Sequence, residues 1–123
     1  MKRILVLDDD EDILFVVERI LGDAGFQTYG TPYGEGLIQL AEQFDPELIL
    51  LDFMLADGNG GELCRSLKLH HSLRNVPVIM FSAYANPRVK FEDFGCDHFI
   101  SKPFDLQDLV AQVNKYLYPA LLQ

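Results

Sequence analysis

"ILVLDDDED" (residues 4–12) places five consecutive acidic residues directly after a continuous apolar run. Four apolar residues without alternation are typical of a strand that is buried on both faces of a sheet. Asp10, Glu11 and Asp12 fall in the first turn of the helix that follows, where the helix dipole favours negative charge. Asp8 and Asp9 lie at the strand end itself, where two adjacent carboxylates repel each other. The helix dipole does not account for acidic residues at these two positions.

The same alternation of a short apolar run and a helical pattern recurs along the chain. The first helix is indicated by apolar residues spaced three and four apart up to Gly25, which favours a left-handed C-cap. Further strands are predicted over residues 26–29 (more polar, at an edge), 48–51, 76–81 and 98–101. Further helices are predicted over 35–43 and 62–71, as a short segment within 84–95, and over 106–117 after an Asp105 N-cap. Residues 56–61 (ADGNGG) indicate a loop.

This order of elements predicts one α/β domain over residues 1–123. Strands that alternate with helices through short connections form a doubly wound, five-stranded parallel sheet with helices on both faces. A hydrophobic fraction of 49% in 123 residues supports a packed core. No apolar stretch approaches the roughly 20 residues that span a bilayer, and no signal peptide is visible. We therefore expect a cytoplasmic protein without membrane contact.

Charge and cysteine content narrow the classes of partner. The net charge is −9, from 19 acidic and 10 basic residues. Nucleic-acid binding requires clustered Lys and Arg, which are scattered here, so we expect no direct nucleic-acid contact by this domain. Cys64 and Cys96 lack the spacing of metal ligands and are expected to be reduced thiols.

Charged and hydroxyl side chains follow each buried strand. The carboxyl ends of parallel strands meet at one edge of the sheet, where ligands bind in open α/β folds. The residues at these positions are Asp8, Asp9, Asp52, Ser82 and Lys102. Three gathered carboxylates suit Mg²⁺, or Mn²⁺ in its place. With an ammonium and a hydroxyl on the opposite flank, the set predicts phosphoryl transfer in which a carboxylate acts as nucleophile and becomes an aspartyl phosphate.

Four segments together resemble the receiver (CheY-like) domain of two-component response regulators. They are ILVLDDDED, LILLDFMLADGNGG, VIMFSA and FISKPF, in order and with closely matching spacing over essentially the whole chain. The resemblance implies a flavodoxin-like (βα)5 fold with strand order 2-1-3-4-5. It also implies a domain that accepts a phosphoryl group from a histidine kinase or histidine phosphotransfer protein and switches a protein-interaction surface. Such a domain catalyses only its own phosphorylation and dephosphorylation.

The resemblance also assigns roles to single residues. Asp52 corresponds to the phosphoacceptor, and Asp8, Asp9, Asp52 and the backbone carbonyl of Met54 correspond to the Mg²⁺ ligands. Ser82 and Lys102 correspond to the residues that contact the phosphoryl group. Phe99 stands at the aromatic switch position, whose ring turns inward when Ser82 moves toward the phosphate. The Lys102-Pro103 bond is at a position that is usually cis in this family.

Partners implied by the resemblance are a downstream protein target or a fused output domain, and a homodimer formed on phosphorylation. The stretch between Ser82 and Lys102 departs from the family pattern. It is shorter by about two residues and contains Pro87, so the fourth helix is in doubt.

Parts of the sequence also fit three other functions. A haloacid-dehalogenase-like phosphatase would use Asp8-x-Asp10, but Asp12 stands where that motif has Thr or Val, and no later Gly-Asp-x-x-x-Asp signature follows. A flavodoxin-like FMN carrier needs backbone N–H groups and hydroxyls around phosphate, which the acidic run would repel. A degenerate receiver that binds partners without phosphorylation is disfavoured because all five chemical positions are present.

Overall fold

The computed structural model describes residues 1–83 and 90–119, and it contains the predicted parallel sheet. The strands of this sheet are β1 (Arg3–Leu7), β2 (Gln27–Thr31), β3 (Leu48–Asp52), β6 (Val78–Ser82) and β7 (His98–Ser101). Their spatial order is β2-β1-β3-β6-β7, and all neighbouring pairs are parallel. This order confirms the predicted order 2-1-3-4-5, with the polar strand β2 at an edge.

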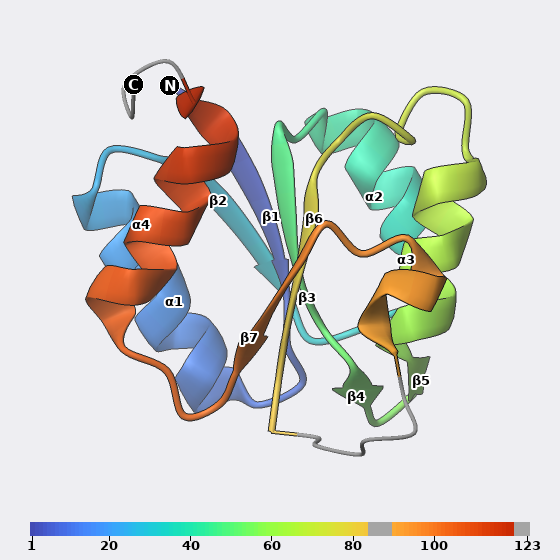
Figure 1. Cartoon of the computed structure of the whole chain (residues 1–123), viewed down its shortest axis with the longest axis horizontal. Helices are drawn as coiled ribbons and strands as arrows, with labels where there is room; N and C mark the ends of the chain where they lie inside the picture. Colours follow the sequence, from blue (N-terminus) through green and yellow to red (C-terminus); the bar gives the residue numbers. More distant parts are fainter. Residues whose placement is uncertain (84–89, 120–123) are drawn as a thin grey trace.

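Helices cover both faces of the sheet (Figure 1). One face carries α1 (Glu11–Asp23) and α4 (Leu106–Leu117). The other carries α2 (Leu37–Phe44), α3 (Gly60–Leu69) and the short 3-10 helix η1 (Phe91–Phe94). Among the described residues, no helix is long and apolar enough to cross a membrane.

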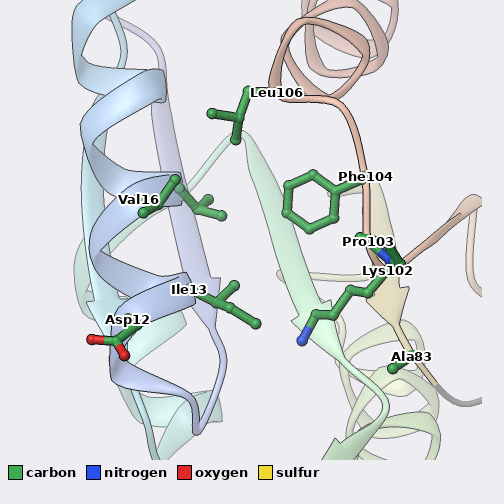
Figure 2. A pocket seen from close by; sticks show the side chains of 9 residues that line it. Asp12, Ile13, Val16, Ala83, Lys102, Pro103, Phe104 and Leu106 are labelled. Atoms are coloured by element: carbon green, nitrogen blue, oxygen red, sulfur yellow. The ribbon is translucent and has the colours of Figure 1, made fainter.

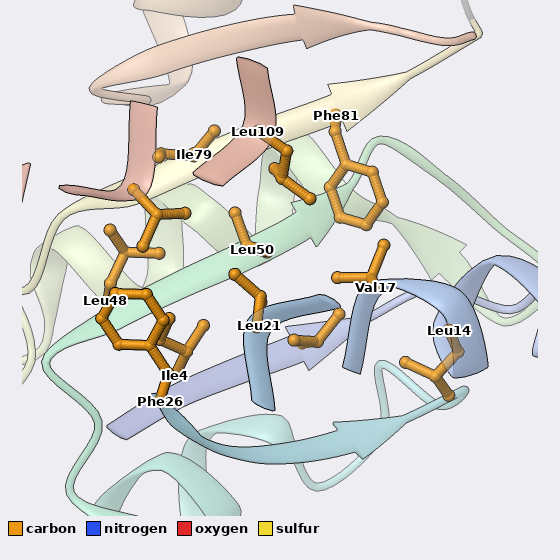
Figure 3. Close-up of a cluster of buried hydrophobic side chains, with 12 residues drawn as sticks. Ile4, Leu14, Val17, Leu21, Phe26, Leu48, Leu50, Ile79, Phe81 and Leu109 are labelled. Atoms are coloured by element: carbon orange, nitrogen blue, oxygen red, sulfur yellow. The ribbon is translucent and has the colours of Figure 1, made fainter. Parts of the chain in front are cut away.

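Two apolar cores explain why the central strands are continuously apolar. Ile4 and Val6 of β1 pack with α1 and α4, whereas Leu5 and Leu7 point to the opposite core under α2 and α3. Figure 3 shows the first core, where Val17 and Leu21 of α1 face the strands. Each fully buried Leu or Ile side chain contributes about 1.5–3 kcal/mol, so these strands are fixed in place and their ends are held rigidly.

Predicted helix caps are present. Gly25 has φ +97°, as expected for a left-handed residue after α1. The Asp105 carboxylate accepts hydrogen bonds from the backbone N–H groups of Gln107 and Asp108 at the start of α4. Asp10 lies one position before the first turn predicted for it and caps α1, because its carboxylate accepts the N–H groups of Asp12 and Ile13. From Asp10 onward, the acidic residues therefore belong to the start of α1.

The predicted loop over residues 56–61 is only partly correct. Met54–Leu55 (β4) and Gly58–Asn59 (β5) form a two-stranded antiparallel hairpin, and α3 already begins at Gly60. Asn59 caps this helix by accepting the N–H of Gly61 at 2.7 Å. A Cβ atom at Gly60 would lie 1.9 Å from the carbonyl oxygen of Asp52, so the close approach of the helix to the end of β3 requires glycine.

Other differences concern element boundaries. The strand predicted over 76–81 begins at Val78 and extends to Ser82, and the strand predicted over 26–29 is shifted to Gln27–Thr31. Of the short helix predicted within 84–95, residues 84–89 with Pro87 lie outside the described residues. The described part contains η1, a single 3-10 segment.

Candidate functional site at the carboxyl edge of the sheet

The sheet brings the predicted polar residues to one edge. Asp8 follows β1, Asp52 ends β3 and Ser82 ends the neighbouring β6. These three polar side chains are buried, with exposed fractions of 0%, 4% and 2% respectively. Lys102 directly follows β7, and its backbone N–H donates to the carbonyl of Ser82 at 2.9 Å. The Lys102-Pro103 peptide bond is cis, as the resemblance implied.

Three carboxylates form an acidic cluster at this edge. Ligand oxygens of Asp8, Asp9 and Asp52 all lie within 4.8 Å of one another. Asp9 is exposed whereas the other two are buried, so the cluster opens to water on one side. Hard oxygen donors with room for several waters fit Mg²⁺ or Mn²⁺. The residues present therefore fit the predicted metal.

The acidity of Asp52 reflects this crowding. Burial, and then the negative charge of Asp8, raise the pKa of Asp52 to about 6. The Lys102 ammonium and the N–H of Met54 act in the opposite direction. Placing a divalent cation against the cluster would favour the ionised carboxylate, which is the nucleophilic form.

Lys102 is the cation of the site. Its Nζ atom lies 2.6 Å from Asp8 Oδ2 and 3.3 Å from Asp52 Oδ2. The ammonium also lies 4.9 Å from the centroid of the Phe81 ring, within cation–π range. The side chain is largely buried, so both ion pairs are shielded from solvent. An ammonium held between two carboxylates is positioned to contact a phosphoryl group on either of them.

Backbone N–H groups complete the site, and the sequence did not reveal all of them. Asp8 Oδ1 accepts the N–H of Asp10 at 2.9 Å. From the hairpin, Met54 N–H donates to Asp52 Oδ1 at 3.3 Å, and Ala56 N–H donates to Asp9 Oδ2 at 2.9 Å. The Ala56 bond was not predicted, because a backbone donor leaves no mark in the residue type. The Met54 carbonyl as a metal ligand stays a prediction.

Phe99 lies away from the acidic cluster, on β7. Its half-buried ring stacks on Phe91 of η1, with centroids 3.9 Å apart and an interplanar angle of 13°. Phe91 in turn meets Phe53 edge-on at 5.4 Å. Phe53 directly follows Asp52, so three rings connect the switch position to the predicted phosphoacceptor. Sequence reasoning missed Phe91 and Phe53, because only tertiary packing brings these phenylalanines together.

An apolar groove opens beside Lys102. It has a volume of about 540 Å³ and lies between α1 and the segment that joins β7 to α4. Ile13 and Val16 line one side, and Pro103, Phe104 and Leu106 line the other (Figure 2). Val16 and its neighbour Phe15 are 43% and 68% exposed, so α1 presents apolar surface next to the site.

Comparison with known protein families decides the assignment. The response regulator receiver domain model matches residues 4–114. The chain belongs to this family.

The similarity to known proteins extends over nearly the whole receiver domain. It is 34% identical to the transcriptional regulatory protein GltR of Pseudomonas aeruginosa, over 94% of this chain and 49% of GltR. It is also 34% identical to the DNA-binding dual master transcriptional regulator RpaA of Synechocystis, over 95% of this chain and 49% of RpaA. The chain thus spans about half the length of these curated relatives.

A solved structure agrees with the fold. The signal receiver domain of a signal transduction histidine kinase from Syntrophus aciditrophicus superimposes with a TM-score of 0.89 at 30% identity, covering 95% of this chain and 90% of that one. The receiver domain therefore has a phosphoacceptor role in two-component signalling. This assignment favours the receiver over the phosphatase and the flavin carrier.

Proposed function

We propose that Asp52 is the phosphoacceptor of this receiver domain and that a histidine kinase or histidine phosphotransfer protein is the donor. The observation that carries the proposal is the position of the Asp52 carboxylate. It is buried at the end of the central strand β3, within 4.8 Å of the Asp8 and Asp9 ligand oxygens and 3.3 Å from the Lys102 ammonium.

Each residue of the site has a distinct part in the proposed transfer. A carboxylate oxygen of Asp52 forms a bond to phosphorus while the bond from phosphorus to the donor histidine nitrogen breaks, and its electron pair returns to the imidazole. The Lys102 ammonium and the Ser82 hydroxyl donate to phosphoryl oxygens, where charge gathers during the transfer. Backbone N–H groups of Met54 and Ala56 orient the carboxylates of Asp52 and Asp9.

Asp8, Asp9, Asp52 and the Met54 carbonyl would hold Mg²⁺, with Mn²⁺ as a substitute. The ion supplies positive charge that neutralises the phosphoryl oxygens when it is bound. The same site would also support hydrolysis of the aspartyl phosphate by water. In this proposal the domain catalyses only its own phosphorylation and dephosphorylation.

The partner that carries the phosphohistidine must bring its imidazole to Asp52. The apolar groove between α1 and the β7–α4 segment adjoins Lys102, and its volume of about 540 Å³ and apolar lining suit side chains of a partner helix. Phe15 and Val16 on α1 offer exposed apolar surface for the same contact. We therefore place the donor protein on this side of the site.

Phosphorylation would then shift Ser82 and Phe99, and with them the surface around η1, β7 and α4. Its recipient is a downstream protein target or a fused output domain, and a homodimer formed on phosphorylation is a further outcome. Relatives twice as long include a protein named as DNA-binding. For this domain, with its net charge of −9, we keep the expectation of no direct nucleic-acid contact. A cytoplasmic location is proposed, in agreement with two free cysteines.

Incubation with Mg²⁺ and acetyl phosphate tests the proposal. Wild type should gain the mass of one phosphoryl group, and Asp52→Asn should not. Loss of labelling in Asp8→Asn, with labelling retained in Asp52→Asn, would support the phosphatase-like alternative instead. No labelling of a folded, Mg²⁺-binding wild type would indicate the degenerate receiver.

A further inference from the structure

The β4–β5 hairpin connects two acids of the site through its backbone. Met54 N–H donates to Asp52, and Ala56 N–H donates to Asp9 at 2.9 Å. The hairpin is only two residues wide on each side, and its residues Met54, Ala56 and Gly58 are exposed. Such a short ladder gains little from its own hydrogen bonds, so contacts outside it must fix its position.

Asp57, the residue after Ala56, supplies such a contact. Its carboxylate accepts the N–H of Gly34 at 3.1 Å on Oδ1 and 3.0 Å on Oδ2, and the N–H of Glu35 at 3.0 Å on Oδ2. Gly34 and Glu35 belong to the segment between β2 and α2. These hydrogen bonds, from Glu35 and then Gly34, lower the pKa of Asp57, so the carboxylate stays ionised. Hydrogen bonds to an ionised acceptor are stronger than neutral ones.

Close packing at Gly34 favours this arrangement. A Cβ atom at Gly34 would lie 2.9 Å from the Leu63 side chain and 3.2 Å from Asp57 Oδ1. The absence of a side chain lets the Gly34 backbone approach the carboxylate. The hairpin is therefore held at two neighbouring residues, at Ala56 by Asp9 and at Asp57 by the backbone of residues 34–35.

We propose that Asp57 is a positioning residue that holds the β4–β5 hairpin against the acidic cluster and thereby sets the affinity of the site for Mg²⁺. The inference rests on the proposed function, because it takes Asp9 and Asp52 as metal ligands. Asp57 itself does not contact the ion. It keeps the Ala56 N–H hydrogen-bonded to Asp9 Oδ2. This bond fixes the orientation of the Asp9 carboxylate, so that its other oxygen can bind the ion. Loss of outer-shell partners of this kind weakens metal binding about 10–100-fold.

The alternative is that Asp57 adds only negative charge. Glu35→Gln is the matched control, because it removes one exposed charge beside Asp57 while the backbone N–H groups that bind Asp57 remain. Asp57→Ala removes both the charge and the hydrogen bonds. Asp57→Asn removes the same charge as the control and keeps one acceptor oxygen.

Mg²⁺ titrations followed by amide chemical shifts, at constant ionic strength, separate the two roles. Asp57→Ala should weaken Mg²⁺ binding about tenfold, at the lower end of the outer-shell range. Glu35→Gln should change it less than about twofold, since exposed charges are largely screened. Asp57→Asn should fall between them. Equal dissociation constants for Asp57→Ala and Glu35→Gln would overturn the proposal.

Amide hydrogen exchange without metal gives a second readout that does not depend on the proposed function. In Asp57→Ala, the amides of Gly34, Glu35 and Ala56 should exchange faster, while amides of β3 keep their protection and report an intact fold. Unchanged exchange at Ala56 would also overturn the proposal. A wild type that binds no Mg²⁺ would instead contradict the proposed function, and Ala56 exchange would still decide whether Asp57 anchors the hairpin.

Discussion

Lys102 pairs more closely with Asp8 than with Asp52: its ammonium lies 2.6 Å from the first carboxylate and 3.3 Å from the second. Asp8 is fully buried, and its other carboxylate oxygen accepts the N–H of Asp10. The ammonium therefore compensates the charge of Asp8 first. From the same position it reaches the carboxylate that we propose as phosphoacceptor, so one side chain serves both the stability and the chemistry of the site.

Removing this cation should destabilise the fold strongly. Lys102→Met leaves the buried Asp8 charge without its partner, which costs about 3–5 kcal/mol in comparable buried pairs. Urea denaturation in EDTA measures the loss, and added Mg²⁺ should restore part of it. Arg19→Gln is the control, because the Arg19–Asp23 pair is exposed and worth less than about 1 kcal/mol. Equal losses in both variants would contradict the role of Lys102.

Asp52 should make the stability of the protein depend on pH when no metal is bound. Its pKa is about 6 in the folded protein, against 3.8 for the free side chain. Because the folded value is the higher one, the unfolded chain loses its proton first, and stability falls as pH rises from about 4 to 6. A difference of about 2 in pKa corresponds to at most about 3 kcal/mol.

Asp52→Asn should therefore be more stable than wild type at pH 7.5 in EDTA, and the advantage should disappear at pH 4. Urea denaturation of both proteins at the two pH values checks this. Mg²⁺ should raise the unfolding free energy of wild type more than that of the variant. A variant that is no more stable at pH 7.5 would mean that burial does not penalise the ionised Asp52.

The stack of Phe91 on Phe99 should restrain the switch. Phe91→Leu removes a ring contact worth about 0.5–1.5 kcal/mol, so Phe99 should turn inward more readily. Beryllofluoride, a phosphoryl analogue, should then bind about two- to tenfold more tightly, as the same free energy requires. Phe94→Leu is the control, because Phe94 lies on the same 3-10 helix but packs on Phe53, at a centroid distance of 5.9 Å. Identical affinities for the two variants would argue against a restraint by Phe91.

The apolar groove should matter for transfer from a protein and not from a small molecule. Val16→Asp places a charge on the α1 side of the groove. With a histidine kinase that phosphorylates wild type, the variant should react at least about tenfold more slowly, as expected for an interface centre. Its labelling by acetyl phosphate should be unchanged. Tyr29→Asp, on the edge strand β2, serves as the control. Equal slowing of transfer in both variants would contradict docking of the kinase at the groove.

The sheet and its polar edge were predictable because a strand that is buried on both faces has apolar residues at consecutive positions. Residues 4–7 and 48–51 are apolar at every position, since alternate side chains enter two different cores. A polar residue follows or ends each strand at the carboxyl edge of the sheet, which identifies Asp8, Asp52, Ser82 and Lys102.

The hairpin and the aromatic contacts were not predictable in this way. Asp57 finds its partners 22 and 23 residues earlier in the chain, and both are backbone N–H groups, which are present in every residue type except proline. The composition of residues 56–61 (ADGNGG) predicted only a loop, whereas hydrogen bonds to Asp9 and to the backbone of residues 34–35 hold this segment in place. Phe91 meets Phe99 only because η1 packs over the sheet.

The most direct measurement locates the phosphoryl group itself. After reaction with Mg²⁺ and acetyl phosphate, borohydride reduces an aspartyl phosphate to homoserine, and peptide mass spectrometry identifies the modified position. We predict homoserine at residue 52 alone. Homoserine at residue 8 or 9, or at no position in a protein that has gained the phosphoryl mass, would contradict the account.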